Sequence, residues 1–194
     1  DIEDTATVHV RSFDQVNLAL HKSVTASGYE NDGMKPEKVV DGDLNSRWSS
    51  RHQDNEWIVV DIGDCYQLTT VKLYWEAAYA TDFDVEVSED GEQYTIAKSI
   101  TGAEGGVQTI DIRKGGEAVE AQFVRIYCKK RNTGYGSSLW ELEVYGEALC
   151  DKEETAIEWT DGHKDGSNYK FIRDGQLFIR LTDGTIYNAF GTLQ

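Results

Sequence analysis

The sequence predicts an all-β protein folded as a β-sandwich or jelly roll. Short runs rich in Val, Ile, Tyr, Phe and Trp alternate with clusters of Gly, Asp and Asn along most of the 194 residues. No stretch longer than a turn or two shows helical periodicity. Turn signals recur about every ten residues, which is typical of the short strands of a sandwich.

Strands are predicted wherever such a run lies between two turn signals. The clearest are residues 56–62, 70–75, 83–88, 93–97, 108–112, 123–128 and 139–145. In the last of them, Trp140 shares one face with Leu142 and Val144, whereas Leu139 falls on the opposite face with two glutamates. The segment 88–91 (SEDG) predicts a hairpin turn, because Gly accepts the positive φ of a tight turn.

Composition shifts near Gly146 and divides the chain. Residues 147–168 are polar and charged, and we interpret them as a linker between a main domain at 17–146 and a tail at 169–194. In the tail, two Asp-Gly turns join three further runs and predict a three-stranded β meander. Three strands alone are marginal in water, so we expect the tail to dock on the sandwich or to be the edge of a larger unit. Residues 1–16 are interpreted as a leader strand or a linker.

The charge of the chain argues against two classes of partner. There are 19 Lys and Arg residues against 35 Asp and Glu residues, which gives a formal net charge of −16. That charge repels nucleic acid and anionic membranes, and no apolar stretch approaches the ~20 residues of a membrane-spanning helix. With 39% apolar residues the composition is that of a globular protein, which we expect to be a monomer.

Residues that usually carry catalysis or bind zinc are sparse. The four histidines lie far apart, and the common motifs of hydrolases, metalloproteases and nucleotide-binding enzymes are absent. Cys65, Cys128 and Cys150 lack the CxxC spacing of a zinc site. We interpret them as inert thiols, with a Cys65–Cys128 disulfide as the alternative. The protein is not expected to be an enzyme, unless the fold brings two carboxylates together as in glycosidases.

The acidic loop within residues 38–48 (KVVDGDLNSRW) is the densest candidate site. Asp41, Asp43 and Ser46 lie in a Gly-containing loop whose carboxylates, hydroxyl and main-chain carbonyls can converge. Oxygen ligands of this kind hold a hard cation such as calcium. The alternative is an acidic surface turn, because the spacing is not that of an EF-hand.

Six blocks of the sequence occur in an order that is typical of one family. They are NLA at 17–19, DGDLNSRW at 41–48, WIVVDIG at 57–63, FDVEVSEDG at 83–91, FVRI at 123–126 and LWELEVYG at 139–146. Together they resemble the discoidin domain, also called the coagulation factor type C domain, whose bacterial members are the family 32 carbohydrate-binding modules. The resemblance implies an eight-stranded, galactose-binding-like jelly roll with a structural calcium ion. The ligands it implies are the Lys38 carbonyl, Asp41, Asp43, Ser46, the Trp140 carbonyl and Glu141.

Two further segments resemble a subgroup attached to enzymes that cut chitosan and β-glucans. They are WEAAYA at 75–80 and RNTGYGSSLW at 131–140. Carboxylates and a guanidinium hydrogen-bond to sugar hydroxyl or amino groups, and an aromatic ring offers its face to a sugar. The sugar site implied by position, at one end of the sandwich, consists of Glu30, Arg47, His52, Glu76 and Tyr135.

Structural roles compete with some of these assignments. Arg47 alternatively braces a loop or pairs with an acid, and the tryptophans at 48, 57, 75 and 140 are expected in the core because each lies in or beside a strand. The predicted function is a non-catalytic, calcium-stabilised carbohydrate-binding module. It would target a secreted, periplasmic or surface-bound bacterial glycan-processing protein to an oligo- or polysaccharide such as chitosan or a β-glucan. The alternative is an adhesion or protein–protein interaction module on the same fold.

Overall fold

The computed structural model describes residues 16–148, 169–173, 176–180 and 185–188. The chain divides into two compact units, Asp1–Cys150 and Asp151–Gln194. The first unit contains an eight-stranded antiparallel sheet, which confirms the predicted all-β class. No helix in the described part of the chain is long and apolar enough to cross a membrane.

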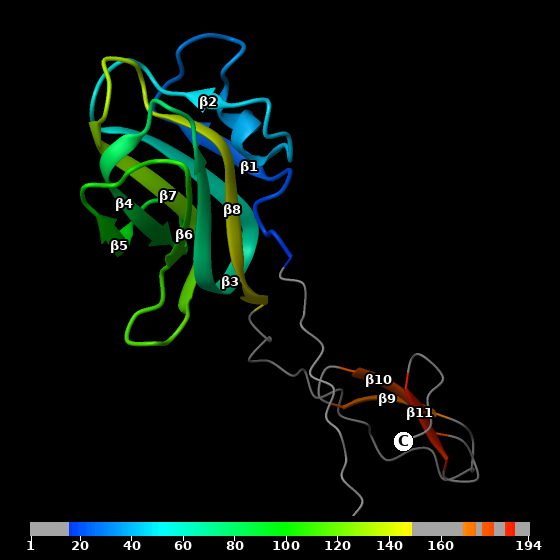
Figure 1. Cartoon of the computed structure of the whole chain (residues 1–194). Coiled ribbons are helices and arrows are strands. Elements are labelled where there is room, and N and C mark those ends of the chain that lie inside the picture. The colour runs from blue at the N-terminus through cyan, green and yellow to red at the C-terminus, as the bar shows by residue number, and fades with distance from the viewer. Residues whose placement is uncertain (1–15, 149–168, 174–175, 181–184, 189–194) are drawn as a thin grey trace, which may run out of the picture. The chain divides into compact units, whose positions relative to one another are not determined.

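The strands of the first unit follow the order β2-β8-β3-β7-β4-β5, and β1 and β6 both pair with β3 (Figure 1). A short 3-10 helix, η1, precedes β2. The elements are β1 (Ser23–Ala26), η1 (Pro36–Val40), β2 (Trp48–Ser49), β3 (Glu56–Trp75), β4 (Ala80–Ser88), β5 (Thr95–Ile100), β6 (Val107–Asp111), β7 (Val119–Arg131) and β8 (Ser138–Ala148).

A single long strand connects the two layers of the sandwich. The sequence predicts separate strands at 56–62 and 70–75, but the structure has one strand of 20 residues, β3. Its first part pairs with β1 and β7, and its second part pairs with β8 and β6. The register shifts between Asp61 and Tyr66, where the strand bends at the lower end of the sandwich in Figure 1. Such a bulge lets one strand turn the corner from one sheet to the other.

The core fills the space between these two layers. Ile58, Leu73, Phe83, Ile126 and Leu142 are fully buried and come from five different strands or strand halves. Burying each side chain of this size contributes roughly 1.5–3 kcal/mol relative to leaving it exposed. Two of the tryptophans expected in the core, at positions 48 and 75, are buried there, and the one at 57 is only partly buried.

The burial of side chains along β8 corrects the prediction that Trp140 lies in the core. Leu139 is fully buried and Trp140 is only partly buried, although the sequence alternation placed Trp140 in the core with Leu142. The pairing of β3 with β8 shifts register between Tyr74 and Trp75, so that Trp75 lies opposite Leu139. The irregularity inserts Trp140 as an extra residue and reverses the alternation on one side of it.

The turn predicted at 88–91 is confirmed. It joins β4 to β5, which pair in antiparallel register from Val87 opposite Thr95. Gly91 adopts φ 76° and its amide donates to the Ser88 hydroxyl at 3.0 Å. A non-glycine residue would be strained in this conformation.

The described cysteines are free thiols. Cys65 lies in the bent part of β3 and Cys128 lies opposite Glu56 at the other end of the first half of that strand. The alternative of a Cys65–Cys128 disulfide is therefore wrong, because the two residues lie at opposite ends of the β3–β7 pairing. Cys150 lies outside the described residues.

The second unit contains the predicted meander. Its sheet has the order β11-β10-β9, formed by β9 (Tyr169–Arg173), β10 (Gln176–Arg180) and β11 (Ile186–Asn188). The segments interpreted as a leader (1–16) and a linker (147–168) lie almost entirely outside the described residues. Docking of the tail on the sandwich stays a prediction.

Candidate functional site

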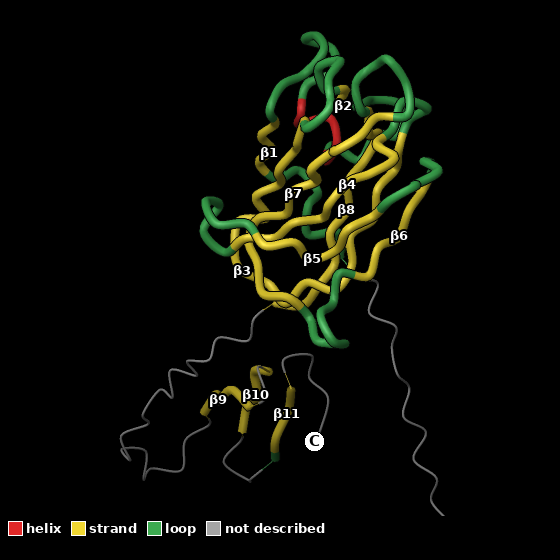
Figure 2. The backbone as a smooth tube through the Cα atoms, turned by 90° about the vertical axis from the view of Figure 1, so that its left-hand side faces the viewer, coloured by secondary structure: helices red, strands yellow, loops and turns green. Residues whose placement is uncertain are grey.

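Loops gather at the end of the sandwich around β2, at the top of Figure 2. Two of them come from the segments before and after β2, one follows β3, and one joins β7 to β8. Ser49 of β2 pairs with Ser138 of β8, and the carbonyl of Ser138 accepts the backbone amide of Glu76 at 3.0 Å. The residues predicted for sugar binding lie in or beside these loops.

Three of those residues are brought into direct contact. His52 Nε2 lies 3.5 Å from Glu30 Oε2, and the His52 ring meets the Tyr135 ring edge to face with centroids 5.7 Å apart. Ser49, which sequence reasoning missed, donates its hydroxyl to the same Glu30 oxygen at 3.0 Å. An acid, an imidazole and a phenol therefore form one continuous polar and aromatic surface.

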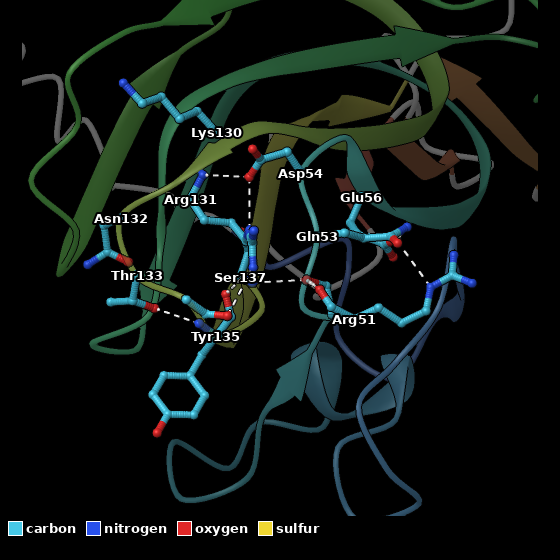
Figure 3. Close-up of polar contacts among 12 residues, drawn as sticks. Arg51, Gln53, Asp54, Glu56, Lys130, Arg131, Asn132, Thr133, Tyr135 and Ser137 are labelled. Atoms are coloured by element: carbon cyan, nitrogen blue, oxygen red, sulfur yellow. Dashed lines mark hydrogen bonds and ion pairs between the residues drawn. The ribbon is translucent and has the colours of Figure 1, made fainter.

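Tyr135 is an exposed aromatic residue at a loop tip. It is 66% exposed, and in Figure 3 its ring points away from the other labelled side chains. Its backbone amide donates to Thr133 Oγ1 at 3.1 Å. The next residue, Gly136, packs so closely that an added Cβ would lie 2.1 Å from the Ser50 carbonyl oxygen. The loop is thus pinned at its base, and the ring remains free to stack on a ligand.

Glu76 directly follows β3 and joins the same end of the molecule. Its Oε2 accepts the Ala78 amide at 2.8 Å, which orients the carboxylate, and its Oε1 has no partner among the described residues. Glu30 likewise keeps its Oε1 unpaired in the described part of the chain. Each carboxylate therefore presents an oxygen that can accept a hydrogen bond from a ligand.

Arg47 takes a different place from the other predicted residues. Its guanidinium carbon lies 5.2 Å from the centre of the Trp140 ring, a cation–π contact. Its Nε is buried and has no hydrogen-bond partner in the described structure. No acidic partner of Arg47 is present among the described residues, so the alternative of an ion pair with an acid is not found. Within the described residues, no hydrogen bond, ion pair or ring contact joins Arg47 to Glu30, His52 or Tyr135.

A buried carboxylate, that of Glu56, forms hydrogen bonds with the loops that carry the predicted sugar-binding residues. Glu56 is 1% exposed, and its oxygens accept hydrogen bonds from Arg51 and Gln53 (Figure 3) and from the Ser27 hydroxyl. Arg51 also donates to the Ser27 carbonyl at 2.6 Å. A buried charge is tolerated only when it is paired and hydrogen-bonded in this way. Glu56 thereby joins the loop that carries Glu30 to the loop after β2.

The predicted calcium loop is closed by its own hydrogen bonds. Asp41 accepts the Asp43 amide at 2.9 Å and the Ser46 hydroxyl at 2.6 Å. Asp43 accepts the amide of Asn45 at 2.9 Å, and Lys38 Nζ lies 3.8 Å from Asp41 Oδ2. In the described ranges, no group of three or more His, Cys, Asp or Glu side chains is arranged to hold a metal ion.

The environment of Glu141 favours a bound cation at this acidic loop. Its side chain is 3% exposed, and neither of its carboxylate oxygens has a hydrogen-bond partner within the described residues. Burial raises its pKa to about 7; the charges of Asp41, Glu143 and Asp43 act in the same direction, and the Gly42 amide opposes them. An unpaired buried carboxylate facing an acidic loop fits a bound cation, because the cation would supply the missing counter-charge.

The fold and these loops belong to a known family. Residues 23–142 match the F5/8 type C domain. The chain belongs to this family. The resemblance to discoidin domains predicted from the sequence is thereby confirmed.

Solved structures of two carbohydrate-binding modules are similar to this chain over about two thirds of its length. Chitosan-binding module 1 of a chitosanase/glucanase from Paenibacillus sp. IK-5 is 39% identical, with a TM-score of 0.64. The match covers 68% of this chain and 99% of that module. Module 2 of the same enzyme, solved in complex with chitotriose, is also 39% identical with a TM-score of 0.64, covering 67% of this chain and all of that module.

A curated relative is much longer than this chain. The polysaccharide lyase 8 family protein HylA from Enterococcus faecalis is 32% identical over an alignment of 143 residues, and the match covers 66% of this chain. The chain spans 10% of the length of that relative. A family 32 module of NanJ from C. perfringens, solved with galactose, is 17% identical with a TM-score of 0.56 and supports the fold alone.

Proposed function

We propose that this F5/8 type C domain is a carbohydrate-binding module for a chitosan-type oligosaccharide, that is, a β-linked chain bearing free amines. The observation that carries the proposal is the surface formed by Glu30, His52 and Tyr135, with Glu76 on the neighbouring loop. Support comes from the 39% identity to chitosan-binding modules over nearly their whole length.

The chemistry of the site suits an amino sugar. The unpaired oxygens of Glu30 and Glu76 accept charge-assisted hydrogen bonds from ammonium groups, which are stronger than neutral ones. The exposed ring of Tyr135 offers a face to the apolar side of a pyranose. The net charge of −16 attracts a cationic polymer and speeds encounter.

A hollow on the sheet fits a sugar less well than the surface at the loop end. It has a volume of about 200 Å³ and is lined in part by Tyr94 and Phe123. The Arg125 guanidinium already stacks on the Tyr94 ring at 3.8 Å. Gly91 packs against the Phe123 ring, where an added Cβ would lie 3.1 Å from it. Neither ring is as open as that of Tyr135, so we favour the loop end.

The calcium ion is a further part of the proposal. Asp41, Asp43, Ser46 and Glu141 would hold it together with the main-chain carbonyls of Lys38 and Trp140. When bound, the ion would supply positive charge between η1 and β8 and stabilise the loop. The unpaired Glu141 carboxylate is what supports this assignment.

The proposed context is a larger secreted or surface protein of a bacterium. The chain would bind the glycan without catalysing its cleavage and would target an attached glycan-processing enzyme to it, as a monomeric module at 17–146 joined by a linker at 147–168 to the tail at 169–194. The relatives support this view, since one is a module of a chitosanase/glucanase and another is a polysaccharide lyase family protein.

Isothermal titration of the full chain with chitotriose and with a neutral β-glucan oligosaccharide tests the proposal. We expect saturable binding of chitotriose. Binding of the neutral oligosaccharide alone would make the ligand a β-glucan. No binding to either, or to a wider glycan panel, would overturn the proposal in favour of a protein-interaction or adhesion module.

A further inference from the structure

An arginine at the end of β7 links two loops of the proposed sugar site. Arg131 Nε donates to Asp54 Oδ1 at 2.8 Å, and its backbone amide donates to the same oxygen at 3.2 Å. Its Nη1 donates to the carbonyls of Gly134 and Tyr135, each at 3.1 Å (Figure 3). One planar guanidinium therefore ties the loop that contains His52 to the loop that contains Tyr135.

The environment of this pair distinguishes it from an ordinary surface ion pair. The Arg131 side chain is 19% exposed, although Asp54 is 46% exposed. A mostly buried guanidinium that meets three fixed acceptors is held in one orientation, because its donors form a rigid fork. The pair accordingly fixes the geometry of the two loops, whereas a fully exposed pair would add little.

The hydrogen bonds of Arg131 reach the backbone of Tyr135, the residue whose ring is available to a ligand. Tyr135 is 66% exposed and its ring makes an edge contact with His52, so the placement of the ring depends largely on the backbone of Tyr135. The Tyr135 backbone is held by Arg131 at its carbonyl and by Thr133 at its amide. Gly134 beside it would otherwise give the loop tip wide conformational freedom.

We infer that Arg131 is a positioning residue of the sugar site, which holds the Tyr135 ring against His52 and so prepares it for stacking on the ligand. This inference rests on the proposed carbohydrate binding. A ring that is already in place loses less conformational freedom on binding, which raises affinity without any new contact.

The test is a double-mutant cycle on the full chain, measured by titration with chitotriose. Arg131→Lys keeps the positive charge but cannot meet the three acceptors at once, and we expect roughly a fivefold to tenfold weaker Kd. Tyr135→Ala should weaken binding about tenfold. If Arg131 acts through Tyr135, the double variant should bind as Tyr135→Ala does, within about twofold. Arg113→Lys, at an exposed Arg–Asp pair remote from the loops, is the matched control.

A second readout does not need the sugar. Nuclear Overhauser contacts between the His52 and Tyr135 rings should be present in the wild type and in Arg113→Lys, and lost in Arg131→Lys. Asp54→Ala, which releases the other side of the guanidinium, should weaken the same contacts and the Kd in the same direction. This variant serves if Arg131→Lys does not fold.

Three results would overturn the inference. They are wild-type affinity in Arg131→Lys, an additive loss in the double variant as for a direct sugar contact, and unchanged contacts between the two rings. A wild type that binds no glycan would instead refute the proposed function. The ring contacts would then still decide whether Arg131 positions Tyr135.

Discussion

The imidazole of His52 meets the phenol of Tyr135 at an angle of 87° between the ring planes, although one ring comes from the loop after β2 and the other from the loop between β7 and β8. This contact makes the two loops a single surface. Glu30 extends the surface through its contact with His52, so that an aromatic face and a carboxylate lie side by side.

Neutralising a carboxylate should weaken binding of an amino sugar selectively. For Glu76→Gln we expect about a tenfold weaker Kd for chitotriose and a smaller change for a neutral β-glucan, because only the ammonium group of the amino sugar forms an ion pair with the carboxylate. Added salt should weaken wild-type binding of chitotriose and have less effect on the variant. Titration at two salt concentrations measures both effects. Equal losses for the two oligosaccharides would contradict an amine contact at Glu76.

Removing the exposed ring should affect binding more than stability. Tyr135 is 66% exposed, so Tyr135→Ala should change the melting temperature little. For a neutral β-glucan, the same variant should cost more affinity than Glu76→Gln, because stacking would dominate. Calorimetry of unfolding and of binding separates these effects. A large fall in melting temperature with unchanged affinity would show that the ring is structural.

Chelation of the proposed calcium ion should destabilise the first unit. An ion that binds only the folded state adds ~2.7 kcal/mol at a hundredfold excess over its Kd, which corresponds to a fall in Tm on the order of 5–10 °C when it is chelated. Asp41→Ala should have a low Tm that chelator no longer changes. Asp64→Asn, an exposed carboxylate in the bend of β3, should respond to chelator like the wild type. A melting curve of the wild type that ignores chelator, with no metal found by elemental analysis, would leave the loop as an acidic turn.

Cys128 should be inert in the folded protein. Burial raises the pKa of its thiol to about 12, so almost no thiolate forms at pH 8, and the side chain is also inaccessible. We expect no labelling of Cys128 by a thiol reagent at pH 8 until denaturant is added. Mass spectrometry of the digested protein distinguishes it from the other cysteines. Rapid labelling of Cys128 under native conditions would show that β7 opens readily.

Local patterns in the sequence predict most of the fold. Alternating apolar residues placed the strands, and the Gly-containing turn at 88–91 placed one hairpin. The sequence does not predict the continuity of β3, because residues 63–67 (GDCYQ) lack the alternation of apolar residues seen on either side, yet they form the bend of one strand. The extra residue at Trp140 depends on pairing with β3, which no pattern within β8 reveals.

For the candidate site as well, the sequence predicts some residues and leaves others unpredicted. The resemblance to a family named Glu30, His52, Glu76 and Tyr135 by position, and the structure puts them at one end of the sandwich. The residues that hold the loops were not predicted, because the bond of Arg131 to Asp54 joins positions far apart in the sequence. Contacts of this range follow from the topology, and a charged residue in a strand or loop gives no local sign of its partner.

The bend of β3 has a consequence for the width of the binding surface. Glu56, at the start of this strand, anchors the loops that carry Glu30 and His52, and Glu76 directly follows its end. Both arms of one strand thus support the same surface, and the angle between them is set at the remote corner around Gly63, where φ is 89°. A substitution at that corner should change the spacing across the surface, and hence the length or linkage of glycan that it accepts, without altering any residue that touches the ligand.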